Sequence, residues 1–159
     1  MKAILRGAML GLSFLALASG VFAQSTPNSE LGNWKLNVEK SKYSPGPPPK
    51  SAMITMVAAG NGVKYSSKGV NAEGKPTGQE YTANYDGKDV PLTGSLIADT
   101  TSLKRVDAQT VERVDKKGGK VVQTVRRAYA KDGKSFTATI KGTNAKGEPV
   151  NNAAFYEKS

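Results

Sequence analysis

Turn signals recur at short intervals along most of this chain, and they limit what it can fold into. Each contains glycine, usually after an asparagine, aspartate or lysine, and they lie at 61–62, 71–74, 86–87, 117–119, 132–133 and 144–147. Such residues accept the positive φ that tight hairpins need. Their spacing, about 8 to 14 residues, leaves no room for a crossover helix and predicts a β-meander.

Between the turns, apolar and polar residues alternate with the period of two that half-buried strands show. Phe136, Ala138 and Ile140 share one face, for example, opposite the polar residues between them. We expect about eight to ten strands, near 33–38, 52–59, 62–70, 78–85, 88–92, 95–106, 110–116, 120–130, 134–142 and 151–157.

So many strands in a short chain must either close or split into two layers, because an open sheet leaves two unpaired edges. Sequential hairpins favour an all-β fold, an antiparallel up-and-down β-barrel. A seven-stranded sandwich with Greek-key crossings is the alternative, but it needs longer connections than these. One connection differs: the proline-rich segment 41–51 predicts an extended strap between the first two strands.

The first 23 residues are typical of a cleaved signal peptide. Lys2 and Arg6 are basic, residues 8–18 are apolar, and a small-x-small site ends at Ala23. The apolar stretch is shorter than the roughly 20 residues of a membrane span. We therefore expect a periplasmic or secreted protein, cut after Ala23. The predicted layout is a signal peptide over 1–23, a flexible leader over 24–30 and one barrel domain over 31–159.

The charge of the exported chain raises the question of an anionic partner. Without Lys2 and Arg6, 21 basic residues remain against 13 acidic ones, a net charge of +8. The basic residues are scattered singly, as lysines that keep strand edges soluble and unpaired would be. We expect a monomer that binds no nucleic acid. A weak affinity for an anionic membrane or polysaccharide surface is left open.

The residue inventory excludes several kinds of chemistry. The chain has no histidine and no cysteine, so it lacks a Ser-His-Asp triad, a cysteine nucleophile and a zinc site of imidazole or thiolate. Its carboxylates lie near turns and strand ends, where solvation is easy and catalytic pKa shifts are hard to produce. We expect no enzymatic activity, no metal and no cofactor.

Three arginines share a strand face with apolar neighbours, namely Arg105, Arg113 and Arg127. An inward guanidinium needs a partner, because burying it alone is expensive. On one interpretation the arginines lie outside or at a barrel mouth and pair with Asp107, Glu112 or Asp115. On the other they anchor the acidic head of an apolar ligand, together with tyrosines. The candidate ligand-binding residues are Tyr65, Tyr81, Arg105, Arg113, Arg127, Tyr129 and Tyr156.

Both ends of the exported chain resemble a known group. Gly32-x-Trp34 resembles the Gly-x-Trp signature of lipocalins and fatty-acid-binding proteins, and residues 155–158, FYEK, resemble the closing strand of the latter. The chain thus looks like a small exported bacterial lipocalin-like protein, a calycin-type barrel. The resemblance implies that Trp34 plugs the closed end, with Arg126 or Arg127 stacked on its face by a cation–π contact.

Two departures from the fatty-acid-binding pattern concern the ligand. Those proteins carry Arg-x-Tyr in the last strand, whereas this chain has Ala154 two residues before Tyr156. They also have a helical lid after the first strand, where this chain has the proline strap. Whether Tyr156 or Phe155 faces inward is left open by the sequence.

The predicted function is that of an exported, non-catalytic binding or carrier protein for a small hydrophobic or amphipathic molecule. The alternative is a filled barrel with a structural or stress role in the cell envelope, which contacts anionic surfaces through its basic exterior. A void of about 300 Å³ or more among the inward side chains would distinguish the first from the second.

Overall fold

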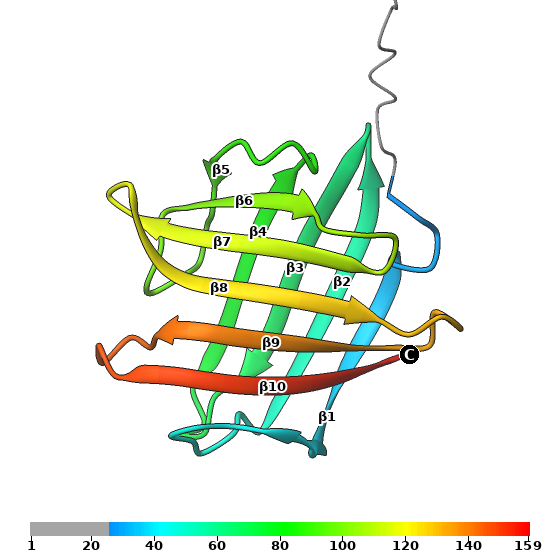
Figure 1. Ribbon diagram of the computed structural model, residues 1–159. Coiled ribbons are helices and arrows are strands. Elements are labelled where there is room, and N and C mark those ends of the chain that lie inside the picture. The colour runs from blue at the N-terminus through cyan, green and yellow to red at the C-terminus, as the bar shows by residue number, and fades with distance from the viewer. Residues whose placement is uncertain (1–25) are drawn as a thin grey trace, which may run out of the picture.

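The computed structural model describes residues 26–159 and shows ten antiparallel strands rolled into a nearly closed barrel (Figure 1). The predicted signal peptide lies outside these residues. The strands are β1 (Gly32–Lys42), β2 (Ser51–Ala59), β3 (Gly62–Val70), β4 (Pro76–Ala83), β5 (Val90–Pro91), β6 (Thr100–Arg105), β7 (Thr110–Lys117), β8 (Lys120–Tyr129), β9 (Ser135–Thr143) and β10 (Pro149–Lys158). Within the described part of the chain, no helix is long and apolar enough to cross a membrane.

The strand order confirms an up-and-down arrangement. It runs β4-β3-β2-β1-β10-β9-β8-β7-β6-β5, so sequential hairpins build the sheet and β1 joins the last strand, β10. Figure 1 shows β1–β4 at the back, crossed steeply by β6–β10 at the front. Each of the ten expected segments contains a strand, and the Greek-key alternative is wrong.

The barrel closes at a seam between β4 and β5. One bridge pair joins the two edges, Glu80 and Thr93, whose backbone N–H groups each donate to the other's carbonyl oxygen over 3.0 Å. The Thr93 hydroxyl donates to the same Glu80 carbonyl at 3.3 Å. The seam is thus held by few contacts, compared with the full ladders elsewhere.

The two ends of the barrel differ in how they are filled. The largest fully buried apolar side chains gather at one end, where β1, β3, β7 and β9 begin; they are Trp34, Met56, Val63, Leu103, Val111 and Phe136. We call this the closed end. The opposite end, the mouth, is surrounded by the loops 43–50, 71–75, 92–99 and 144–148. Several apolar residues toward it, such as Val38, Ala52 and Ile140, are only half-buried.

Residues 26–30 differ from the predicted flexible leader. Thr26 and Glu30 are both buried, the second with 2% of its surface exposed. The Thr26 hydroxyl donates to the carbonyl of Gly62 at 2.8 Å, and the backbone N–H of Glu30 donates to the carbonyl of Pro27. This segment therefore forms a turn that covers the closed end of the barrel.

The strand expected over 95–106 is shorter in the structure. Its first part is a loop in which the Ser95 hydroxyl oxygen accepts hydrogen bonds from the backbone N–H groups of Ile97 and Ala98. A serine that bonds to its own following backbone favours a turn over a strand. As a result Leu96 projects from the loop, 83% exposed, at the mouth.

Candidate functional site

Trp34 lies at the closed end with no surface exposed. Its indole N–H donates to the carbonyl of Glu30 at 3.2 Å, while Tyr129 and Phe136 pack edge-on against it, with ring centroids 5.8 and 4.9 Å away. Gly32, two residues earlier, has φ +114°, which glycine adopts without strain. The indole thus fills space between the leader turn and the barrel wall.

The cation on the indole is not the expected arginine. Arg126 is exposed, because the inward side chains of β8 near this end are Arg127 and Tyr129. The cation over the Trp34 ring is Lys158, with Nζ 5.1 Å from the centroid. The assignment of Arg126 to the plug is therefore wrong, and Arg127 has different neighbours.

Arg113 lies inside the barrel and is neutralised there by Asp115. Two hydrogen bonds join the groups, Nε to Oδ1 at 2.7 Å and Nη2 to Oδ2 at 2.8 Å. Thr101 donates to the same carboxylate at 2.6 Å, and Arg113 donates to Gln79 Oε1 at 2.8 Å. The pairing with Asp115 was one of the sequence alternatives, but it lies in the interior and not outside.

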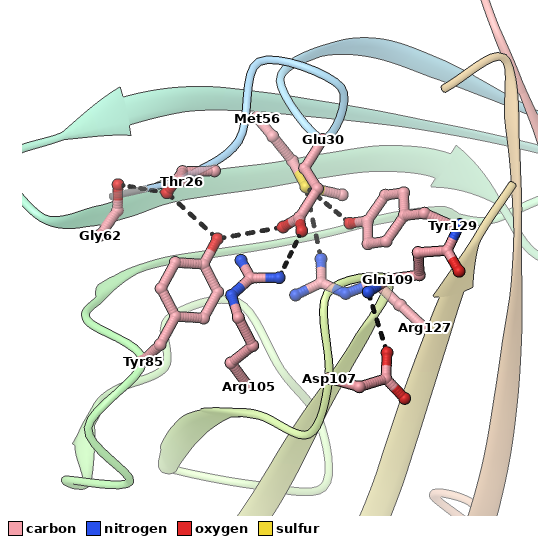
Figure 2. Close-up of polar contacts among 10 residues, drawn as sticks. All are labelled: Thr26, Glu30, Met56, Gly62, Tyr85, Arg105, Asp107, Gln109, Arg127 and Tyr129. Carbon is pink, nitrogen blue, oxygen red and sulfur yellow. Dashed lines mark hydrogen bonds and ion pairs between the residues drawn. The ribbon is translucent and has the colours of Figure 1, made fainter. Parts of the chain in front are cut away.

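Arg105 is paired as well, by a residue that the sequence analysis did not consider. Its Nη1 lies 2.7 Å from Glu30 Oε1, with the side chains 10% and 3% exposed, and its guanidinium lies 4.5 Å above the Tyr85 ring. Figure 2 shows Glu30 reaching down from the leader turn between Tyr85 and Arg105. Burial alone lowers the pKa of Arg105, but the bond to Glu30 and its negative charge outweigh burial and raise it.

Among residues 26–159, Arg127 has no acidic partner. It is 3% exposed, and its Nη2 donates to the Tyr81 hydroxyl at 3.2 Å. Its Nη1 donates to the Met56 sulfur at 3.4 Å (Figure 2). Its Nε has no partner among the described residues, and none of their carboxylates forms an ion pair with it. Burial lowers the pKa of Arg127, but the surrounding tyrosines outweigh burial and raise it, so the group stays charged.

The interior charges of residues 26–159 therefore do not balance. Three guanidinium groups, of Arg105, Arg113 and Arg127, face two carboxylates, of Glu30 and Asp115. Each carboxylate is bonded to one arginine, which leaves one positive charge at Arg127.

Arg127 also lines an internal cavity of about 100 Å³ in the middle of the barrel. Its wall is partly polar and partly apolar, made by Ile54, Tyr65, Gln79, Arg113, Gln123, Val125, Arg127, Phe136, Ala138, Ile140 and Tyr156. A pocket of about 330 Å³ lies toward the mouth, beside Pro76, Leu96, Ile97 and Ala145. Gln79 and Gln123 line both spaces, so the cavity and the mouth pocket adjoin at these two residues.

The candidate ligand-binding residues separate into two groups. Tyr65, Arg113, Arg127 and Tyr156 line the cavity, and Tyr81 supports it by stacking on Tyr65 with centroids 4.7 Å apart. Arg105 and Tyr129 lie instead among the contacts of the closed end (Figure 2).

The orientation of the last strand is also resolved. Tyr156 is buried and stacks on Phe136 at 4.8 Å. Phe155 faces outward, where the Lys40 ammonium lies 5.2 Å from its ring centroid.

Three site residues were missed by sequence reasoning: Glu30, Gln79 and Gln123. Gln79 is two residues before the inward Tyr81, so strand alternation could have found it. Glu30 precedes the first strand and carries no such signal. Among residues 26–159, no group of three or more acidic side chains is placed to share a metal ion.

Comparison with known proteins gives a weak structural likeness. No family model and no curated relative matches the chain. Among solved structures, the zebrafish ileal bile acid-binding protein complexed with cholic acid is similar, with a TM-score of 0.49 and 11% identity, over 82% of this chain and 99% of that one. A likeness of this size says nothing about what this chain binds.

Proposed function

We propose that this chain is an exported, non-catalytic binding protein for a small amphipathic anion, whose acidic head lies against Arg127. The observation that carries the proposal is the single unbalanced charge beside the cavity. A buried cation without a partner is costly, and an anion offering charge-assisted hydrogen bonds would offset that cost. The expected ligand therefore carries one negative charge.

Arg127 is the anchor because the other two arginines are occupied. Arg113 holds Asp115 by two bonds and Arg105 holds Glu30. At either of them an incoming carboxylate would meet a guanidinium that a buried acid already neutralises. At Arg127 it would meet the unpartnered Nε, with the hydroxyl of Tyr81 nearby.

The two spaces divide the ligand into a head and a body. The cavity of about 100 Å³ compares with the roughly 30 Å³ that a water occupies in the liquid, so it has room for an acidic head and a few carbons. The mouth pocket of about 330 Å³ takes the apolar remainder against Leu96, Ile97 and Pro76. A completely filled barrel would offer neither space, so the structural alternative is less well supported.

A non-catalytic role fits the groups around these spaces. Asp115, the carboxylate beside the mouth pocket, is committed to Arg113 and Thr101. With no histidine or cysteine in the sequence, no proton-transfer pair is evident beside a bound ligand. Export rests on the features of residues 1–23; amino-terminal sequencing of the protein from a bacterial host should give Gln24 first.

Calorimetric titration of the mature protein with dodecanoate and with the uncharged dodecanol tests the binding proposal. We expect dodecanoate to bind more tightly, and Arg127→Leu to abolish this preference. Arg126→Leu is the matched control, because its side chain points outward on the same strand. Equal binding of acid and alcohol, or an Arg127→Leu variant with unchanged affinity for dodecanoate, would contradict the proposal.

A further inference from the structure

Two glutamines lie where the cavity meets the mouth pocket. Gln79 comes from β4 in the back layer and Gln123 from β8 in the front layer (Figure 1), and both line the two spaces. We call this position the neck. A ligand that reaches from Arg127 to the mouth would therefore lie beside both amide groups.

The Gln79 amide is oriented by Arg113. Its oxygen accepts a hydrogen bond from Arg113 Nη2 at 2.8 Å, so the amide nitrogen is left as a donor toward the ligand path. Arg113 is in turn fixed by its two bonds to Asp115. The donor at the neck is therefore held by a buried network and not by a freely rotating surface chain.

Gln123 lies on the inward face of β8, in phase with Val125 and Arg127, and a β-bulge adjoins it. Asp115 of β7 pairs with Gln123, but Lys116 pairs with Val121, so Val122 is the extra residue. On the other side of β8, Gly142 has φ +139°, and a Cβ there would collide with the carbonyl oxygen of Val122. The bulge turns Val121 outward, so Gln123 ends the inward row of β8, and only glycine fits opposite the bulge.

Gln123 keeps its acceptor for a ligand. Its amide nitrogen donates to the carbonyl of Thr143 over a long 3.4 Å, which leaves its oxygen toward the neck. The two spaces are thus lined from opposite layers by one amide with a free donor and one with a free acceptor. A hydroxyl group both donates and accepts, so it can bond to both amides at once.

We infer that Gln79 and Gln123 select ligands that carry a hydroxyl or a similar neutral polar group between the acidic head and the apolar end. This inference rests on the proposed function. A plain hydrocarbon at the neck would remove water from both amides without replacing its hydrogen bonds, which costs affinity. The preferred class is therefore a hydroxylated amphipathic acid.

The test compares dodecanoate with its monohydroxy isomers, in which the hydroxyl moves one carbon at a time along the chain. Binding to the mature protein is measured by calorimetry. We expect one isomer, or two adjacent ones, to bind roughly five- to tenfold more tightly than dodecanoate. Gln123→Met keeps the length of the side chain without its hydrogen bonds, so it should bring that ratio close to one. Gln109→Met, in the loop at the closed end, is the control and should keep the ratio.

The outcomes separate this inference from the proposed function. If dodecanoate binds through Arg127 but no isomer binds more tightly, the selection at the neck is wrong and the carrier function stands. The selection is also wrong if the preference survives in Gln123→Met. If neither dodecanoate nor any isomer binds the wild-type protein, the proposed function itself fails.

Discussion

The three inward arginines show how neighbours decide the role of a residue. Arg105, Arg113 and Arg127 all share a strand face with apolar residues, and all are placed inside. Two are neutralised by carboxylates, and the third is surrounded by tyrosines and a methionine sulfur. Only the third has a charge to offer to a ligand.

Replacing Trp34 with alanine should separate stability from binding. The indole is fully buried, so the variant should lose about 3 to 5 kcal/mol of unfolding free energy through lost burial and a cavity. Dodecanoate affinity should be unchanged at a temperature where the variant is folded, because Trp34 lines neither the cavity nor the mouth pocket. Urea unfolding and calorimetry measure the two effects. Lost binding with an unchanged unfolding midpoint would make Trp34 a ligand contact.

The buried tyrosines should make the fold sensitive to alkali. Burial raises the pKa of Tyr43 to about 12, and it also raises the pKa values of Tyr65, Tyr129 and Tyr156. The folded state binds these phenolic protons more tightly than the unfolded state does. Stability is therefore full below about pH 10, the pKa of tyrosine in an unfolded chain, and falls as the pH rises further.

We therefore expect the urea midpoint to fall between pH 10 and 12, with phenolate absorbance appearing together with unfolding. Tyr43→Phe removes one of these groups, so its midpoint should fall less steeply over the same range. Phenolate absorbance at pH 10 in fully folded protein would contradict the assignment of these side chains to the interior.

At the scale of strands, alternation and turn chemistry predicted most of the fold. Most hairpins have a glycine in their turn, although the β6–β7 turn at 106–109 has none, and period-two patterns place the strands within a few residues. The strand start expected at residue 95 was wrong, because the Ser95 hydroxyl accepts hydrogen bonds from the backbone just after it and so forms a turn. The leader turn could not be predicted, because Glu30 is held by Arg105, 75 positions away.

The candidate site was also predictable only in part from strand alternation. Strand phase identifies inward arginines and tyrosines, but it does not say which carboxylate pairs with which arginine. Simple alternation from Tyr129 also places Val121 inside, whereas the bulge at Val122 leaves Val121 59% exposed. A bulge changes the phase of a strand without changing its composition, so the exposure of Val121 emerges only from the structure.

Removing the Glu30 carboxylate should show that the leader turn belongs to the fold. Glu30→Ala leaves the guanidinium of Arg105 buried without an acid, and breaking a buried pair in this way costs about 3 to 5 kcal/mol. Glu157→Ala is the control, because the ion pair of Glu157 with Lys40 is exposed and should matter little. Urea unfolding of both variants gives the comparison. Two equally mild effects would mean that the turn only rests on the barrel.

At the scale of the whole molecule, the barrel combines a filled half and an open half. The closed end is sealed by Trp34 and the leader turn, and the space for a ligand begins above it and widens toward the mouth. Few bridges join the strand edges at the seam, and the Glu80–Thr93 pair is one of them. A ligand could therefore enter through the mouth or by parting this seam, and the position of the pocket favours the mouth.

A disulfide across the seam distinguishes these two routes. Glu80 and Thr93 exchange both backbone hydrogen bonds, and such pairs have Cα atoms about 5.5 Å apart, within the range that a disulfide spans. Since the chain has no cysteine, the double variant Glu80→Cys/Thr93→Cys has one possible intramolecular pairing. Closing so short a loop should add up to about 3 kcal/mol of stability.

The reduced form of the same double variant is the control for its oxidised form. We expect oxidation to raise the melting temperature and to leave the stopped-flow association rate of dodecanoate unchanged, because neither residue lines the mouth pocket. A large fall in that rate on oxidation, restored by reduction, would show that the ligand enters by parting β4 from β5.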